Sequence, residues 1–302
     1  METISSPPPK SSLKKFVELS LKLVITIACF WYISTKINFS DAWTALLKAK
    51  WWLLFIAVLF YFISKIISGF RLNINFRNIN LYLSEWDNMK LYWLGMFYNL
   101  FLPGAISGDA YKVIILNKTF KAPIKKTSIA VLLDRVSGLL GLGVLLSVYG
   151  LIVLDNYLFY ILLVTGCLIS ILIFYLIIRS FFKDFLPGFL STFLLGLLVQ
   201  TLQVICIYFI MWSLGISFHN SEWIFIFLIS SAISVLPISL GGGLGTRELI
   251  FAEGARFFNI KPELGIIISL LFYLNNLLSS AGGAYFIFHS PLKKNNSVFE
   301  SN

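Results

Sequence analysis

LPGAISGDAYK at residues 102–112 and LPISLGGGLGTRE at residues 236–248 each end an apolar stretch that is too short to cross a membrane. Proline removes a backbone hydrogen-bond donor and breaks a helix, whereas glycine allows the chain to reverse direction. We therefore expect each apolar stretch to enter the membrane, turn, and leave on the side from which it came. The two re-entrant helical hairpins are predicted over residues 89–116 and 223–258.

The composition of the 302-residue chain places it in a membrane. Apolar residues make up 58% of the chain and charged residues 13%, whereas an ordinary globular protein has about 25% charged residues. A spanning helix needs about 20 mostly apolar residues. The segments that meet this requirement are residues 17–34, 51–69, 127–150, 157–178, 191–214 and 264–288. The sequence thus predicts an all-α polytopic integral membrane protein with about six spanning helices and two hairpins.

The expected organisation is one transmembrane domain with short flanking segments. A disordered basic lead is predicted over residues 1–15, the domain over residues 16–289, and a polar tail over residues 290–302. With two hairpins and six crossings, 16 basic residues face the cytoplasm and 6 face outside, and both termini are cytoplasmic. If all eight segments crossed, with the N-terminus inside, 9 basic residues would face the cytoplasm and 13 would face outside. The positive-inside rule therefore favours the model with two hairpins. Lys65, near the end of the second predicted span, is expected to reach for the membrane interface.

The hairpins belong to two units of opposite predicted orientation, each with one span before the hairpin and one after it. Gly108 and Gly242 both lie five residues after the proline of their Leu-Pro pair. A basic residue, Lys112 or Arg247, follows that proline by nine or ten residues. Inverted repeats whose broken helices meet near the midplane are typical of transporters. A chance likeness between apolar segments is the alternative explanation.

The two turns are expected to line an aqueous site, because non-helical backbone at membrane depth is costly elsewhere. A short helix follows each turn, and its first amides lack intrahelical partners, which favours a bound anion. Phosphate is the predicted anion, because lipid headgroups are the abundant anionic ligands in a membrane. The residues predicted to bind it are Lys112, Arg135 and Arg247, with Gly104, Gly108, Gly241, Gly242 and Gly245. Helix capping by the first-turn residues, without any ligand, would explain the same pattern.

Asp134 and Arg135 are informative because they lie inside an apolar run, where charges are costly and mark either a pathway or a buried pair. Adjacent helical residues point about 100° apart, so each should have another partner. For Arg135 the candidates are Asp109 and Glu248. Asp109, Asp134 and Glu248 are predicted to orient the cations or to couple protons, and an arginine fork suits bidentate phosphate binding. The alternative is a structural ion pair near the cytoplasmic end.

Several polar residues are predicted to lie at membrane depth. The polar cavity residues are expected to be Asn99, Ser239, Asn275 and Asn276, although the last two could instead bond across helices. No residue pattern suggests a metal site, a cofactor or a catalytic group. Small residues such as Ser137, Gly138 and Gly141 indicate close helix packing. The three cysteines and two histidines share no metal-ligand spacing, and no nucleotide-binding motif occurs.

Taken in order, these motifs resemble the transmembrane, flippase-like domain of lysylphosphatidylglycerol synthases. The resemblance is carried by Asn99 with Leu102-Pro103-Gly104, by Gly108-Asp109-Ala110-Tyr111-Lys112, by Asp134-Arg135 with Gly138, and by Leu236-Pro237, Ser239, Gly241-Gly242, Gly245, Arg247 and Glu248. It covers roughly residues 15–288. The family often has arginine where Lys112 stands, which keeps the charge but not the fork.

This resemblance implies a multi-pass protein of the bacterial inner membrane that handles lipids. In bifunctional relatives such a domain moves a charged lipid between leaflets, while a soluble domain makes that lipid from aminoacyl-tRNA. Because the chain ends soon after its last predicted span, we expect a stand-alone member that does not transfer lysine by itself.

The expected function is therefore translocation of an anionic phospholipid or a lipid-linked headgroup. A membrane-embedded transferase acting on a lipid phosphate, and a small-solute carrier or channel, are the alternatives. A homo-oligomer or a separate lipid-synthesising enzyme would fit as partners. The net charge of +10, whose excess lies in the first 126 residues, is expected to orient the protein and contact anionic headgroups rather than nucleic acid.

Overall fold

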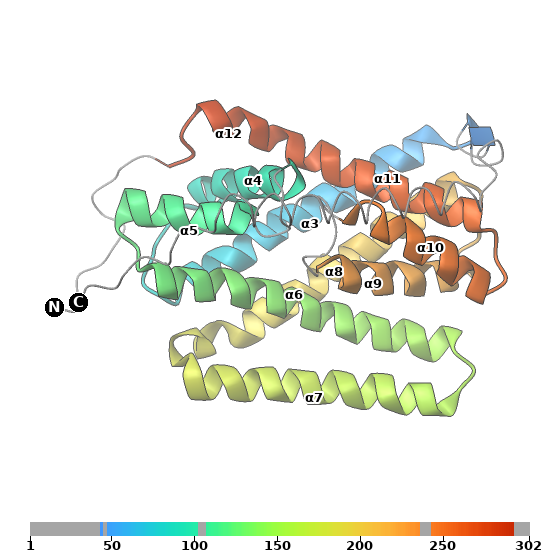
Figure 1. The fold of residues 1–302 in the computed structure, drawn as a ribbon, viewed down its shortest axis with the longest axis horizontal. Helices are drawn as coiled ribbons and strands as arrows, with labels where there is room; N and C mark the ends of the chain where they lie inside the picture. Colours follow the sequence, from blue (N-terminus) through green and yellow to red (C-terminus); the bar gives the residue numbers. More distant parts are fainter. Residues whose placement is uncertain (1–42, 45–46, 102–106, 236–242, 293–302) are drawn as a thin grey trace, which may run out of the picture.

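The computed structural model describes residues 43–44, 47–101, 107–235 and 243–292 (Figure 1). The long helices of this part are α3 (Trp51–Arg77), α6 (Ile124–Val153), α7 (Tyr157–Phe181), α8 (Phe189–Ser213) and α11 (Pro262–Ala281). The shorter ones are α4 (Glu85–Phe101), α5 (Ser107–Phe120), α9 (Glu222–Ser234), α10 (Thr246–Phe257) and α12 (Tyr285–Phe288). Two 3-10 turns, Lys183–Gly188 and Gly282–Ala284, precede α8 and α12.

Five helical segments of the described residues are long and apolar enough to cross a membrane. They are Trp51–Arg77, Ile124–Val153, Tyr157–Phe181, Lys183–Ser213 and Pro262–Phe288. These segments confirm five of the predicted spans and the all-α polytopic class. The remaining predicted span, residues 17–34, lies outside the described residues. The second span differs from its prediction, because α3 continues to Arg77 instead of ending near residue 69.

Four of the shorter helices, α4, α5, α9 and α10, form two pairs at the positions of the predicted hairpins. α4 packs against α5, and α9 packs against α10. The α4–α5 pair lies toward one end of the molecule and the α9–α10 pair toward the other (Figure 1). The helices have 17, 14, 13 and 12 residues, fewer than the roughly 20 needed to span a bilayer. The connecting residues 102–106 and 236–242, where the turns are predicted, lie outside the described residues.

Helix contacts repeat between the unit α3–α6 and the unit α8–α11. Within the units, α3 packs on α4 as α8 packs on α9, and α5 packs on α6 as α10 packs on α11. Between the units, α6 contacts α8 and α9, while its counterpart α11 contacts α3 and α4. α3 and its counterpart α8 pack directly on each other. This exchange of contacts is what two units related by a twofold axis require, and it supports the predicted repeat.

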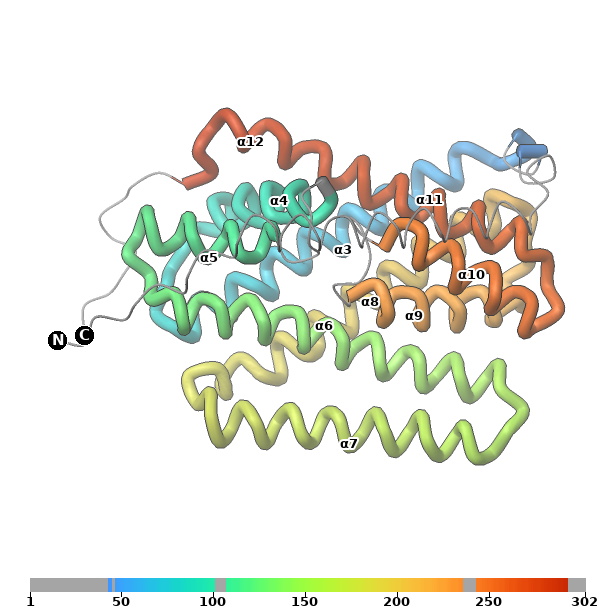
Figure 2. Tube along the Cα trace, viewed as in Figure 1, coloured from blue at the N-terminus to red at the C-terminus, as the bar shows by residue number. Residues whose placement is uncertain are grey.

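The units are held together by close helix contact, and one helix lies outside them. A methyl group added at Gly141 of α6 would lie 2.6 Å from the amide nitrogen of Leu197 in α8, so the glycine allows the two backbones to meet. α7 lies at the edge of the molecule beside α6 (Figure 2), and only Phe174 and Ile178 are buried in it. A helix that is apolar all round and largely exposed is suited to contact with lipid.

Candidate functional site

A cavity of about 300 Å³ lies where the two units meet. Residues of α3, α4, α5, α6, α8, α9, α10 and α11 line it. Both helix pairs contribute at their inner ends: Asn99 and Lys112 come from α4 and α5, and Ser234 and Arg247 come from α9 and α10. The residues that flank the two predicted turns therefore border one and the same cavity.

The charged residues that line the cavity are mainly cations. They are Lys65, Arg71, Lys112, Arg135 and Arg247, against the carboxylates Asp109 and Asp134. The described lining residues thus have three positive charges in excess. Buried charges at membrane depth are costly and usually mark a pathway or a binding site.

Asp109 is shared by two of the cations. The Lys112 ammonium donates to Oδ1 of Asp109 at 3.0 Å, and the Arg135 guanidinium donates through Nε to Oδ2. The Lys112 ammonium also lies 4.7 Å from the centre of the Tyr92 ring. This geometry decides between the two predicted partners of Arg135 in favour of Asp109. The Asp109 carboxylate therefore binds both Lys112 and Arg135, the two cations that were predicted to bind phosphate.

Asp134 pairs with a residue that sequence reasoning had not selected. Arg71 of α3 donates from Nε to Oδ1 at 2.7 Å and from Nη2 to Oδ2 at 3.2 Å. Gly138, one helical turn after Asp134, leaves room for the guanidinium, because an added methyl group would lie 2.9 Å from Nη1 of Arg71. The expectation that adjacent Asp134 and Arg135 have separate partners is confirmed.

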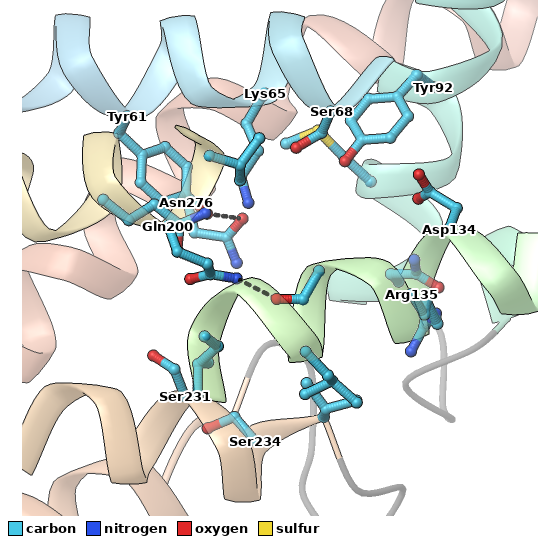
Figure 3. Close-up of a pocket in the computed structure, with 18 of the residues that line it drawn as sticks. Tyr61, Lys65, Ser68, Tyr92, Asp134, Arg135, Gln200, Ser231, Ser234 and Asn276 are labelled. Carbon is cyan, nitrogen blue, oxygen red and sulfur yellow. Dashed lines mark hydrogen bonds between the residues drawn. The ribbon is translucent and has the colours of Figure 1, made fainter. Parts of the chain in front are cut away.

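Lys65 lies in the cavity and does not reach for a membrane interface, which corrects the prediction. α3 extends a further 12 residues, to Arg77, so Lys65 is in its middle. Figure 3 shows the side chain extending from α3 into the cavity, and its ammonium lies 4.6 Å from the centre of the Tyr61 ring. No carboxylate of the described residues forms an ion pair with it. One face of α3 carries polar residues at a spacing of three or four: Tyr61, Lys65, Ser68 and Arg71. This helical spacing is the sequence pattern that would have predicted them as cavity residues.

Arg247, the second residue of α10, is buried with 7% of its surface exposed. Its guanidinium carbon lies 4.8 Å from the ring centre of Phe272 and 5.9 Å from that of Phe227. Among the described residues, its Nη1 has no hydrogen-bond partner and no carboxylate pairs with it. Contact with aromatic faces partly offsets the cost of burying the charge. An anion in the cavity would complete its bonding.

Two of the amides expected to hold an anion have side-chain acceptors at the helix starts. The Gly108 amide donates to Oδ1 of Asn99 at 2.8 Å, and the Gly245 amide donates to Oε2 of Glu248 at 2.6 Å. Glu248 is fully buried and also accepts from the Ser269 hydroxyl at 2.9 Å. Gly108, Gly245 and Glu248 do not line the cavity. The structure thus gives these two glycines and Glu248 capping contacts, which is the alternative left open by the sequence, and their roles toward a headgroup stay predictions.

The adjacent asparagines of α11 have different surroundings. Asn276 lines the cavity and accepts from the Tyr61 hydroxyl at 3.0 Å (Figure 3). Asn275 is buried and donates to the Cys206 sulfur of α8 at 3.3 Å. One asparagine is therefore a cavity residue and the other joins two helices. The remaining predicted site residues, Gly104, Ser239, Gly241 and Gly242, lie outside the described residues.

Fold and site together define a class: an α-helical, multi-pass membrane protein with a positively charged central cavity between the helices α3–α6 and α8–α11. Residues 19–282 match the family model described as Lysylphosphatidylglycerol synthase TM region, and the chain belongs to that family. A comparison with curated proteins finds no significant match. The family membership confirms the resemblance found in the sequence motifs. The described residues contain no cluster of three or more side chains that could hold a metal ion.

Proposed function

We propose that this protein moves the phosphate-bearing headgroup of a lipid between the two leaflets of a membrane. The observation that carries the proposal is the excess of cations in the cavity between the two helix pairs. Phosphate is the anion that a lipid headgroup offers, and Arg135 has the forked guanidinium that binds it at two points. The headgroup would pass through the cavity while its acyl chains stay in the surrounding lipid.

The helix pairs are the moving parts in this proposal. The α4–α5 and α9–α10 pairs are too short to span and reach the cavity from opposite ends of the molecule. We infer that they are re-entrant and open the cavity to one leaflet at a time. Asp109 holds Lys112 and Arg135 in place when no headgroup is bound. A separate enzyme would make the lipid that the protein moves.

The proposed setting is a bacterial inner membrane with both termini in the cytoplasm. The distribution of basic residues supports this orientation, because it places the connection between α5 and α6 inside. A cysteine at exposed Lys125, in a background without the three native cysteines, tests it in oriented vesicles. Labelling by an impermeant maleimide from the cytoplasmic side alone is expected. Labelling from the outer side would contradict the re-entrant arrangement of α4 and α5.

Lipid exchange in reconstituted liposomes tests the function directly. Phospholipids with a nitrobenzoxadiazole group on one acyl chain are placed in both leaflets, and dithionite quenches those in the outer leaflet. The protein is expected to raise the quenched fraction above that of protein-free liposomes, and Arg135→Ala is expected to remove most of the gain. Lys118→Gln is the matched control, because Lys118 is an exposed cation of α5 that does not line the cavity. A new lipid product without any gain in exchange would instead indicate a transferase.

A further inference from the structure

The carboxylates of the cavity lining are already paired with cations of the protein. Asp134 accepts two hydrogen bonds from Arg71, and Asp109 accepts from both Lys112 and Arg135. A ligand that brings an ammonium group would therefore find no unpaired carboxylate among the described lining residues. It would also meet five protein cations, which repel it.

The aromatic faces that an ammonium group would need are largely occupied as well. Among the described residues, four aromatic side chains line the cavity: Tyr61, Tyr92, Phe272 and Tyr273. Lys65 lies over Tyr61, Lys112 over Tyr92, and Arg247 over Phe272. Cation–π recognition of a choline-like group needs open ring faces. Three of these four rings already have a protein cation in that position.

The positive charges without an acidic partner come from both repeated units. Lys65 belongs to α3 of the first unit and Arg247 to α10 of the second, and neither forms an ion pair within the described residues. The other lining cations, Arg71, Lys112 and Arg135, each pair with a carboxylate. An anion that satisfies this cavity has to supply more than one negative charge.

We infer that the cavity selects headgroups with two or more negative charges and no ammonium group, the class of lipid monophosphates and diphosphates. This inference rests on the proposed function and names its substrate class. A phosphomonoester carries about −1.5 to −2 charges at pH 7, because its second pKa is about 6. A phosphodiester headgroup carries only one negative charge, and phosphatidylcholine carries none in sum. A lysylated headgroup, the kind for which the family model is named, would add ammonium groups among the five cations.

Exchange rates of three labelled lipids test the inference. Liposomes with the reconstituted protein receive phosphatidate, phosphatidylglycerol or phosphatidylcholine, each with the same labelled acyl chain. The expected order is phosphatidate, then phosphatidylglycerol, then phosphatidylcholine, with a ratio of about tenfold or more between first and last, since tenfold corresponds to 1.4 kcal/mol. Equal rates for all three lipids would overturn the charge inference and leave the proposed function standing.

Variants of Lys65 distinguish the selection of headgroups by their charge from a general loss of structure. Lys65→Gln is expected to lower the ratio of phosphatidate to phosphatidylcholine exchange at least about threefold, because one positive charge leaves the cavity. Lys65→Arg keeps the charge and is expected to keep the ratio, and Lys118→Gln is the surface control. A ratio that is unchanged in Lys65→Gln, with phosphatidylcholine exchange intact, would contradict the inference.

A soluble anion distinguishes a lipid headgroup from a free phosphate. Liposomes loaded with radiolabelled pyrophosphate are expected to retain it, while external pyrophosphate is expected to slow phosphatidate exchange by competing for the cavity. Release of the trapped pyrophosphate without exchange of any lipid would overturn the proposed function. The inference that the cavity selects anions with two or more negative charges would still hold. Absence of exchange, release and pyrophosphate binding together would overturn both.

Discussion

Arg71 and Asp134 form a two-point ion pair that joins α3 to α6 at the wall of the central cavity. Their atoms lie 2.7 Å apart from Nε to Oδ1 and 3.2 Å apart from Nη2 to Oδ2. Both side chains are buried, so water does not screen the pair. The pair neutralises one cation of the cavity and fixes the helix face from which Lys65 also extends.

Removal of one partner of this pair is expected to destabilise the protein strongly. Asp134→Asn leaves the Arg71 charge buried without a counterion, at a cost of about 3–5 kcal/mol. The measurement is the free energy of unfolding in detergent or bicelles. The double variant Arg71→Met with Asp134→Leu removes both charges and is expected to recover most of that loss, since paired apolar replacements are often neutral. A double variant as unstable as Asp134→Asn would show that the pair is needed for more than mutual neutralisation.

Gly138 is expected to be required for the same ion pair. A methyl group there would lie 2.9 Å from Nη1 and 3.4 Å from Nη2 of Arg71, so Gly138→Ala should displace the guanidinium from Asp134. We expect a loss of about 1–3 kcal/mol in unfolding free energy, the usual cost of overpacking. Gly143→Ala is the matched control on the same helix, because its methyl group meets nothing within 4 Å. That control should hold or raise stability, by up to about 1 kcal/mol, because alanine favours the helix.

The spans were predictable because a run of apolar residues is a local property of the chain. The end of α3 was not, because its last turns contain polar residues that are buried by tertiary contacts. Asn73 donates to the Leu83 carbonyl at 3.2 Å, and Asn88 of α4 donates to the Gly69 carbonyl at 2.7 Å. These contacts let the helix continue past its apolar stretch. The misplaced helix end is the reason why Lys65 and Arg71 were not expected in the cavity.

The charged residues of the candidate site could be predicted from the sequence. The hydrogen-bond partners of its backbone amides could not. Asp109, Lys112 and Arg135 stood out as charges in apolar surroundings, and they form one cluster. Gly108 and Gly245 stood out as helix starts, yet their amides are taken by nearby side chains. Sequence alone indicates that a helix start needs an acceptor, but it does not tell whether the acceptor is a ligand or a cap.

Loss of the Asp109 charge is expected to strengthen anion binding. Its carboxylate occupies the donors of Lys112 and Arg135 that a phosphate would use, so ligand and carboxylate compete for them. Asp109→Asn should bind dihexanoyl phosphatidate about tenfold more tightly, a difference of 1.4 kcal/mol. Isothermal titration calorimetry measures this, with Asp184→Asn as a surface control, because Asp184 pairs with Lys126 on the exposed surface. Weaker binding by Asp109→Asn would mean that the carboxylate positions the two cations for the ligand.

Glu248 is expected to act as a structural cap and not as a proton carrier. Its two oxygens accept from the Gly245 amide and the Ser269 hydroxyl, and the side chain is fully buried away from the cavity. Glu248→Gln keeps one acceptor oxygen and loses the other, so we expect a loss of about 1 kcal/mol in stability, the usual value for a helix cap. The variant should retain the lipid selectivity of the native protein and the same dependence of exchange rate on pH between 5 and 8, a range of roughly three units around the second phosphate pKa of about 6. A flattened pH profile in Glu248→Gln, at unchanged unfolding temperature, would instead assign proton coupling to this carboxylate.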